Sequence, residues 1–467
     1  MKFCIVTLGC KVNQYESRAI ESILISRGHT PAQAGTGCDA CVINTCAVTA
    51  ESERKSRQAA RAMKKAEPKA IIALCGCLAE LDAAAAQRLG ADLTGGSGER
   101  LAFIDKLEMA VSERRGSKNR GAADDAGVLE EPAGEDTELG AGAAISCGAN
   151  GGAGGAGKLA GRTRKPGFEE LPPGSSARRT RALLKIQDGC DNFCAYCVIP
   201  YARGRSVSLP PERAAEYAAQ LERRGFREIV VTGIEISSYG YDLGGTPALT
   251  DVLKSIGISA PGARLRLGSL DPGAISARFC DELLALPNIC RHFHLSLQSG
   301  CDATLRSMGR KYGAQEAAEA IARLRAGYPG CGITADLITG FPGETDAQFE
   351  ETMAFIEEAG FSGMHIFPFS PRPGTRAAAM EGQVGKKTAR DRARAAAGLA
   401  GDMAEAFRKS LVGERLEVLF ERERGGLVTG HSDNYVEVAV EKGAVRNDLR
   451  SVLVISAEDG LVMAEIV

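Results

Sequence analysis

Three cysteines in the segment GCDNFCAYC carry the clearest chemical signal in this chain of 467 residues. Cys190, Cys194 and Cys197 are spaced C-x3-C-x2-C, directly after a short apolar run. Three thiolates this close together can bind three irons of a [4Fe–4S] cluster, which leaves the fourth iron open to a small molecule. A structural zinc site needs four ligands, and no second cysteine or histidine pair adjoins this loop. The spacing therefore predicts an iron–sulfur cluster with one free coordination position.

A second group of three cysteines lies near the amino terminus. Cys10, Cys46 and Cys77 each come at the carboxyl end of an apolar run, in TLGC, VINTC and LCGC. Neighbouring strand ends of a parallel sheet lie about 5 Å apart, so these thiolates can converge on one further cluster. Buried structural cysteine is the alternative, and it explains one or two such positions better than three. Cys75 points to the same strand face as Cys77 and competes for the third ligand position.

The other cysteines are expected to pack as small apolar side chains or, for Cys147 in a Gly/Ala-rich stretch, to be inert. The packing positions are Cys4, Cys38, Cys41, Cys280, Cys290 and Cys331. The first residues, MKFCIVTLGC, lack the basic region of a signal peptide, and no apolar run is long enough for a membrane span. Fifteen cysteines then indicate metal chemistry in a reducing, cytoplasmic compartment without a membrane partner.

Composition excludes several other classes of protein. The chain has 57 Lys and Arg against 59 Asp and Glu, a net charge of −2, with 44% hydrophobic residues. Wholly disordered, collagen-like and small disulfide-stabilised proteins do not have this composition. A polycationic nucleic-acid binder is also excluded, so any nucleic acid must bind to local patches. The length predicts two or three domains.

The elements that must position the cysteines alternate between strand and helix. Residues 1–112 follow a strand–helix pattern that predicts a parallel, flavodoxin-like sheet. Residues 113–179 are acidic, then rich in Gly and Ala, then basic, and we expect a disordered linker there. Its basic end either contacts RNA or is solvated.

Six strand-and-helix units follow in residues 180–410 and predict a partial, TIM-like (β/α)6 barrel with its site at the carboxyl ends of the strands. This part ends in a basic, Ala-rich helix over 386–410. Residues 411–467 contain five short strand patterns, which are typical of a small OB-like β-barrel. The expected fold class is thus α/β with a small β-barrel at the carboxyl end.

With both cysteine groups in view, the chain resembles the radical S-adenosylmethionine (SAM) methylthiotransferases. The motifs that carry the resemblance are LGCKVNQYE, NTCAVT, GCLAE, GCDNFCAYCVIPYARG, DLITGFPGET and FPFSPRPGT. The last segment is similar to the family's TRAM domain, a small RNA-binding barrel. The motifs around Cys10 and Cys190 are most similar to the class that acts on threonylcarbamoyladenosine in tRNA.

The resemblance implies a chemistry and a set of partners. Cys190, Cys194 and Cys197 would hold the SAM-binding [4Fe–4S] cluster, and Cys10, Cys46 and Cys77 an auxiliary [4Fe–4S] cluster that supplies sulfur. One SAM would methylate that sulfur, and a second would give the radical that removes hydrogen from adenine C2. The substrate would be a tRNA anticodon stem-loop, the electron donor a flavodoxin or ferredoxin, and the sulfur donor is not identified. Alternatives are isopentenyladenosine tRNA, a ribosomal-protein aspartate, or a non-catalytic iron–sulfur RNA-binding protein.

SAM itself must be held near the ends of the barrel strands. Candidate contacts there are Tyr196, Gly233, Glu235, Ser269, Gln298 and Asp336; ordinary barrel lining is the alternative for each. His292 and His294 point the same way on one strand and are expected to line the barrel, although metal ligation is an alternative. Arg203 and Arg205 either contact substrate phosphate or stabilise the cysteine loop.

Two features depart from the family's pattern. Leu78 stands where an aromatic residue or methionine is usual, and residues 408–467 have 8 bases and 11 acids, a net charge of −3. A module that binds phosphates should favour bases. RNA affinity would then come from the basic end of the linker or from the basic helix. The alternative for the helix is that its charged side chains only face solvent. The helix residues are Lys386, Lys387, Arg390, Arg392 and Arg394.

Overall fold

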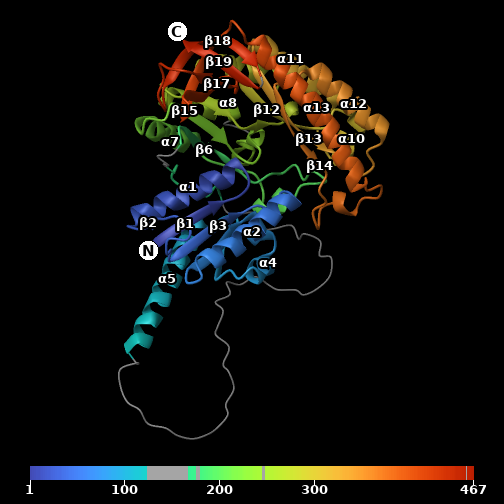
Figure 1. Ribbon diagram of the computed structural model, residues 1–467. Coiled ribbons are helices and arrows are strands. Elements are labelled where there is room, and N and C mark those ends of the chain that lie inside the picture. Colours follow the sequence, from blue (N-terminus) through green and yellow to red (C-terminus); the bar gives the residue numbers. More distant parts are fainter. Residues whose placement is uncertain (124–166, 175–178, 245–247, 459) are drawn as a thin grey trace, which may run out of the picture.

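The computed structural model describes residues 1–123, 167–174, 179–244, 248–458 and 460–467. These residues form an N-terminal α/β domain, an open parallel barrel and a small closed β-barrel, which follow one another along the chain (Figure 1). The expected fold class is confirmed for all three parts. Among the described helices, none is long and apolar enough to cross a membrane.

Five parallel strands form the N-terminal sheet, in the order β2-β1-β3-β4-β5. Its central strands are buried along their whole length because helices cover both faces. Helices α1 and α5 pack on one face, and α2 and α4 on the other. The strands are β1 (Lys2–Thr7), β2 (Thr30–Pro31), β3 (Ala40–Thr45), β4 (Ile71–Gly76) and β5 (Leu93–Thr94), and the helices are α1 (Lys11–Ser26), α2 (Ala50–Ala66), α3 (Cys77–Leu81), α4 (Ala83–Arg88) and α5 (Arg100–Ala123).

Both ends of the expected linker are ordered, which corrects the boundaries at 112 and 180. Helix α5 continues through residues 113–123. At the other end, Leu171 is fully buried, and its carbonyl accepts a hydrogen bond of 2.6 Å from the Tyr15 hydroxyl. Phe168 packs against the barrel core. The average composition of the segment concealed these local anchors, and residues 124–166, where the expected disorder is centred, lie outside the described part.

Six parallel strands build the open barrel, one for each predicted strand. The third is interrupted at Gly268, so it counts as two short segments, β10 and β11. The strands are β6 (Arg181–Lys185), β9 (Glu228–Thr232), β10 (Arg264–Leu267), β11 (Ser269–Leu270), β12 (His292–Gln298), β13 (Gly332–Thr339) and β14 (Gly363–Pro368). The helices outside them are α7 (Pro211–Arg223), α8 (Leu249–Ser259), α9 (Ala277–Leu284), α10 (Asp302–Met308), α11 (Ala314–Gly327) and α12 (Asp346–Ala359).

Alternation along these strands decides which side chains reach the inner face. Leu295 and Leu337 pack outward under the helices, within the main apolar core. Their neighbours His294 and Asp336 therefore point to the inner face. Helix α1 covers part of that face, because its apolar side packs on β6 and β9 through Leu183 and Val230. The inner face of β12, β13 and β14 thus lies toward the amino end of α1.

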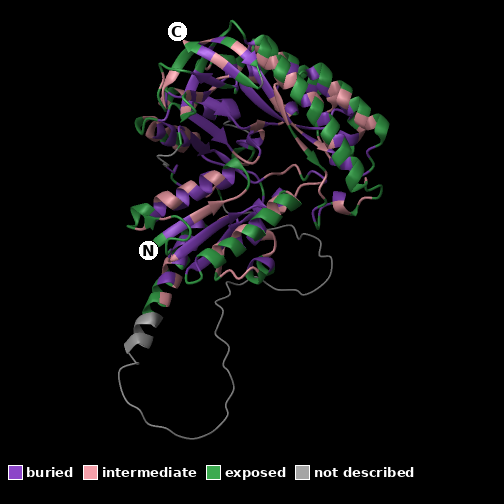
Figure 2. Ribbon diagram, viewed as in Figure 1, coloured by how far each residue is buried: buried purple, intermediate pink, exposed green. Residues whose placement is uncertain are grey.

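Helix α13 (Lys386–Ser410) leads to the closed C-terminal barrel, whose strands are ordered β15-β16-β17-β19-β18. Figure 2 shows alternating buried and exposed residues along α13 and these strands. Arg264 and Arg266 of the open barrel donate to backbone carbonyls of β15, β16 and the loop after β16 at 2.7 to 3.0 Å, which joins the two barrels. The strands are β15 (Arg415–Arg424), β16 (Leu427–Ser432), β17 (Glu437–Val440), β18 (Leu449–Glu458) and β19 (Leu461–Ile466).

Candidate functional site

The loop that carries Cys190, Cys194 and Cys197 follows β6 and is fixed by its backbone. A short antiparallel pair, β7 (Gln187–Asp188) with β8 (Val207–Ser208), closes the loop, which contains helix α6 (Ile199–Arg203). The Cys190 N–H donates to the Gly204 carbonyl at 3.1 Å, and the Cys197 N–H donates to the Cys194 carbonyl at 3.0 Å. These backbone hydrogen bonds fix the loop that carries the three thiols.

Polar groups around these sulfurs suit a cluster held by thiolates. The Ile199 N–H lies 3.4 Å from the Cys197 sulfur, and the Arg310 guanidinium lies 3.4 Å from the Cys194 sulfur. Burial raises the pKa of Cys190 to about 12 and raises that of Cys197 as well, so iron must displace their protons. Arg310 follows helix α10, and no sequence motif singled it out.

The N-terminal motifs position Cys10, Cys46 and Cys77 at the carboxyl edge of the sheet. The Asn13 side chain donates to the carbonyls of Leu8 and Thr45 at 2.8 and 3.0 Å, which ties the ends of β1 and β3 together. The Cys46 N–H donates to the Ser56 hydroxyl at 3.1 Å. Gly9 has φ +98°, and a Cβ there would lie 2.8 Å from that of Cys46. These close approaches explain the residue types of LGCKVNQYE and NTC.

The structure separates Cys75 from Cys77. Cys75 is fully buried in the core beneath α1 and α5, beside Phe3 and Tyr15. Cys77 begins α3 on the side of the barrel. Burial, together with nearby Cys10 and Cys46 and against the effect of Arg203, raises its pKa to about 11. Cys77 is therefore the third member of the N-terminal group, and Cys75 is a core residue.

The two cysteine groups lie next to each other across the domain interface. Cys77 belongs to one small apolar cluster with Ala47 and Ile199, against which Cys190 and Cys197 also pack. The thiols within each group are not in mutual contact at single-ion distances, as expected when a cluster of four irons must fit between them.

A buried ionic network fixes the N-terminal domain on the barrel. The Arg203 guanidinium lies 2.8 Å from the Glu16 carboxylate, 3.0 Å from that of Asp188 and 2.6 Å from the Asn13 amide oxygen. Lys185 and Arg100 complete the charge balance around Glu16. Because Arg203 is buried, it holds the loop and is not placed to meet substrate phosphate. Arg205 is exposed and paired with Asp191 at 2.9 Å.

Among the expected SAM contacts, Tyr196, Gly233 and Glu235 lie at the carboxyl end of the barrel. The Tyr196 ring meets the edge of Phe341 at 6.5 Å between centroids. A Cβ on Gly233 would collide with Gln187, so only glycine fits there. Burial and the neighbouring Asp271 raise the pKa of Glu235 to about 7, against the effect of Arg310. A nearby ammonium group would therefore stabilise the ionised form of the Glu235 carboxyl group.

The other three expected contacts lie at different depths. Gln298 ends β12 in the left-handed region, with φ +67°, at the carboxyl rim. Ser269 is level with His294 in the strand register, and is therefore deeper. Asp336 is three residues before the end of β13, also deeper than the rim position expected for it. Asp336 lies below the rim because β13 runs on to Thr339, and the contact of these residues with SAM stays a prediction.

Asp336 is the centre of a polar group on the inner face. The His294 and His365 rings lie 3.3 and 3.2 Å from its carboxylate oxygens. These hydrogen bonds bring the pKa of Asp336 to about 2, although burial alone would raise it. His294 and His292 share the Thr334 hydroxyl, at 2.9 and 3.0 Å. The two histidines line the barrel as expected, and His294 also meets two further possible metal ligands.

Two residues beside this polar group are open to solvent. Phe367 of β14 is 44% exposed. Lys11, the residue after Cys10, is also exposed, and its side chain forms no hydrogen bond or ion pair with another described residue. Partial enclosure and the positive charges of Arg266 and Arg181 lower its pKa, against the effect of Asp336. Neither residue was singled out from the sequence, because they come together only when the N-terminal domain packs on the barrel.

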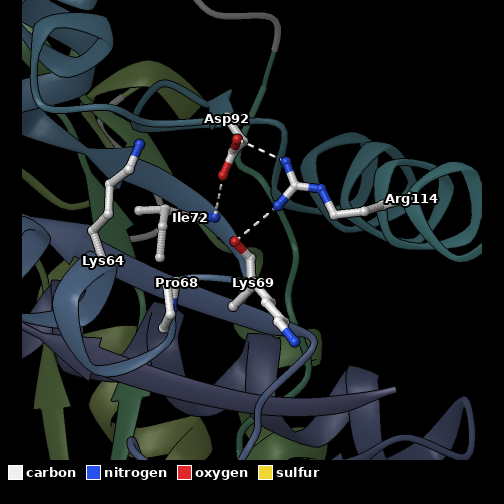
Figure 3. A pocket seen from close by; sticks show the side chains of 7 residues that line it. Lys64, Pro68, Lys69, Ile72, Asp92 and Arg114 are labelled. Atoms are coloured by element: carbon white, nitrogen blue, oxygen red, sulfur yellow. Dashed lines mark hydrogen bonds and ion pairs between the residues drawn. The ribbon is translucent and has the colours of Figure 1, made fainter. Parts of the chain in front are cut away.

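Two surface cavities lie away from this region, along the edge of the sheet near the start of β4. One has a volume of about 300 Å³ (Figure 3). In it, the Arg114 guanidinium is paired with the Asp92 carboxylate at 2.8 Å, next to Lys69. Neither cavity is lined by a member of the two cysteine groups.

Only some of the basic side chains of α13 are both exposed and unpaired. Arg392 is buried and paired with Glu344 and Asp346, both at 2.6 Å. Arg394 is exposed but paired with Asp391 at 2.7 Å. The exposed bases of its first turns that have no side-chain partner among the described residues are Lys386, Lys387 and Arg390.

Comparison with known proteins decides between families. Residues 184–356 match the radical SAM superfamily, and residues 2–94 match uncharacterized protein family UPF0004. A threonylcarbamoyladenosine tRNA methylthiotransferase MtaB from Thermotoga maritima is 33% identical over 435 residues, which cover 93% of this chain and 90% of that protein. A tRNA-2-methylthio-N(6)-dimethylallyladenosine synthase from Pelotomaculum thermopropionicum is 31% identical, covering 91% and 87%. This chain belongs to the radical SAM methylthiotransferase family.

Membership settles the class of cofactor and reaction. As a radical SAM methylthiotransferase, the protein is a transferase that uses SAM and [4Fe–4S] clusters. It is therefore an enzyme and not a non-catalytic RNA-binding protein. The methylthiotransferase fold also matches, at 14% identity and a TM-score of 0.52, the radical SAM methyltransferase TsrM from Kitasatospora setae, over 92% of this chain and 76% of that one. This likeness concerns the fold alone.

Proposed function

We propose that this enzyme transfers a methylthio group to C2 of threonylcarbamoyladenosine beside the anticodon of tRNA. Relatives from Thermotoga maritima, Bacillus subtilis and Chlamydia pneumoniae carry that activity in their names, at 32 to 33% identity over 92% or more of this chain. The relative named for dimethylallyladenosine, at 31%, makes that nucleoside the second candidate. The substrate must therefore be argued from the residues that face it.

The observation that carries the proposal is the charge of the inner face. The threonylcarbamoyl group ends in a carboxylate, whereas a dimethylallyl group is wholly apolar. Lys11 lies beside Cys10 with its ammonium group unpaired within the described chain, and the positive charges of Arg266 and Arg181 act on it more strongly than the negative charges of Asp336 and Glu228. A carboxylate would supply the partner that Lys11 lacks. An apolar group would leave this ammonium partly desolvated and without compensation.

The cysteine groups have separate roles in this proposal. Cys190, Cys194 and Cys197 hold the cluster to which SAM binds, and Cys10, Cys46 and Cys77 hold the auxiliary cluster. With its cofactors bound, the site supplies the one-electron cleavage of SAM and a sulfur atom. Glu235 accepts the SAM ammonium, and Tyr196, Gly233 and Gln298 shape its binding site.

The remaining residues position the nucleoside between the two groups. The Arg203 network fixes the distance between the N-terminal domain and the barrel. Phe367, on the exposed edge strand, offers a ring on which adenine can stack. Lys11, Ser269, Asp336 and His294 face the group attached to adenine N6.

The partners follow from the same proposal. Lys386, Lys387 and Arg390 on α13 contact phosphates of the anticodon stem-loop, since residues 408–467 carry a net charge of −3. A cytoplasmic location and reduction by a flavodoxin or ferredoxin are consistent with iron–sulfur chemistry on tRNA.

The proposal is tested in a bacterial host that lacks its own enzymes of this family. The chain is expressed there, and digested tRNA and ribosomal proteins are analysed by mass spectrometry. The expected result is 2-methylthio-threonylcarbamoyladenosine, with ribosomal protein masses unchanged and no product from the Cys10→Ala variant. Methylthiolation of dimethylallyladenosine, or of a ribosomal aspartate, would contradict the proposal.

A further inference from the structure

A third group of cysteines lies at the other end of β1 and β3 from Cys10 and Cys46. Cys4 is on β1, Cys41 is on β3, and Cys38 comes just before β3. All three are buried, with 6%, 0% and 5% of their surface exposed. Their sulfur atoms lie within 4.8 Å of one another. The composition of a core predicts scattered cysteines, but it does not predict that three thiols meet at one point.

Strand register and a short loop bring these thiols together. Cys4 and Cys41 are direct partners in the parallel pairing of β1 with β3, so their side chains lie on the same face, with sulfurs 3.0 Å apart. The loop before β3 turns at Gly35 and Gly37, both with positive φ. It returns Cys38 over the pair, with the C-x2-C spacing that is common among zinc ligands.

A carboxylate fixes this loop next to the thiols. Glu67, the residue after α2, accepts the N–H groups of Gly35 and Gly37 at 2.8 and 3.0 Å. Its carboxylate also interacts with the Cys38 side chain. Three sulfurs from separate points of the chain thus meet at one position, and a carboxylate lies beside one of them, Cys38.

The spacing suits a single ion better than the alternatives. Zinc–sulfur bonds of about 2.3 Å in a tetrahedron place sulfurs about 3.8 Å apart, so the Cys4–Cys41 pair must open by about 0.8 Å. A [4Fe–4S] cluster needs wider separation, as in the two groups at the other edge of the sheet. A disulfide between Cys4 and Cys41 would leave Cys38 and Glu67 without a role.

The surroundings support binding of a soft cation and give it access. The thiols lie among apolar side chains that include Ile43, Ile72 and Leu74. A cavity of about 290 Å³ opens beside them, lined by Cys38, Glu67 and two arginines. It offers a path from solvent to the thiols.

We propose that Cys4, Cys38 and Cys41 bind one Zn²⁺ ion, with the Glu67 carboxylate as the fourth ligand. The ion joins β1, the loop before β3 and the end of α2. It is a structural ion, independent of the iron–sulfur clusters, and it braces the strand whose far end carries Cys10.

Metal analysis of the full-length, anaerobically reconstituted enzyme tests this site. After gel filtration, wild type should retain about one zinc per chain, and Cys38→Ser should retain almost none with its iron content unchanged. Cys331→Ser, which removes a buried thiol elsewhere, should keep its zinc. The Cys10→Ala/Cys46→Ala/Cys77→Ala variant should also keep it, which excludes zinc that has entered an empty cluster site.

A second readout does not depend on the folding of one variant. Cobalt(II) added to zinc-free wild type should give thiolate-to-cobalt absorption, which Glu67→Gln weakens and Cys38→Ser abolishes. Three results would overturn the proposal: wild-type zinc no higher than that of Cys38→Ser, zinc lost from the variant without Cys10, Cys46 and Cys77, or a Cys4–Cys41 disulfide in the anaerobically isolated protein.

Discussion

Replacing Lys11 by methionine should separate recognition of the substrate from the chemistry of the cofactors. Methionine keeps the length of the side chain and removes its charge. Because the Lys11 side chain has no partner among the described residues, a bound carboxylate would form a new charged hydrogen bond and not replace an old one. Such a bond contributes about 1.5–3 kcal/mol.

That free energy sets the size of the expected effect. At about 1.4 kcal/mol per factor of ten, kcat/KM for a threonylcarbamoyladenosine stem-loop should fall by about 10- to 150-fold in Lys11→Met. The same constant for a dimethylallyladenosine stem-loop should stay the same or rise, because the apolar group gains nothing from the ammonium.

The assay measures both stem-loops with reconstituted enzyme, SAM and a chemical reductant. Iron content and the rate of 5′-deoxyadenosine release without RNA should match wild type, which shows that the clusters are intact. Lys2→Met, at the far end of the sheet, is the matched control and should change neither constant. An equal loss with both stem-loops, or a loss below about threefold with the first, would refute the assigned role of Lys11.

Three further substitutions test the interactions that hold the site in place. Arg203→Ala removes the guanidinium that Glu16 and Asp188 share and leaves only Arg100 and Lys185 beside Glu16, so the free energy of unfolding should fall by about 3–5 kcal/mol in urea titrations, whereas an unchanged midpoint would contradict the interface network. Gly76→Ala puts a Cβ against Asn44 and Thr45 at φ +94°, so iron content should fall toward half while the cluster at Cys190 remains; full iron retention would argue against Cys77 as a ligand. The hydrogen bond to Asp336 raises the pKa of His365, so its stabilisation is present below the ordinary histidine pKa and is lost as pH rises through the raised value. The stability difference between wild type and Asp336→Asn should therefore be larger at about pH 6 than at about pH 8.5, and a pH-independent difference would exclude this pair.

The fold was largely predictable because its local patterns agree with its tertiary structure. Helix α13 begins and ends where the sequence predicts, at residues 386 and 410. Each barrel strand is a short apolar run at the expected place. The cysteine groups were predictable for a related reason, because parallel strands bring their carboxyl ends to one edge.

What could not be predicted depends on contacts between distant segments. Arg203 and Glu16 are 187 residues apart, and no spacing rule links them. Lys11 becomes a site residue only because α1 packs on the inner face of the barrel. The depth of Asp336 depends on where β13 ends, which hydropathy does not fix. Leu171 is one apolar anchor in a segment whose average composition is typical of a linker.

The most direct test of the account is a competition between two substrates. Equal amounts of anticodon stem-loops with threonylcarbamoyladenosine or dimethylallyladenosine are mixed with reconstituted enzyme, SAM and reductant, and the nucleosides are resolved by mass spectrometry. The account predicts that the methylthio group goes to threonylcarbamoyladenosine, and that no product forms when Cys10, Cys46 and Cys77 are replaced. Product mainly on dimethylallyladenosine, or undiminished product without these three cysteines, would contradict it.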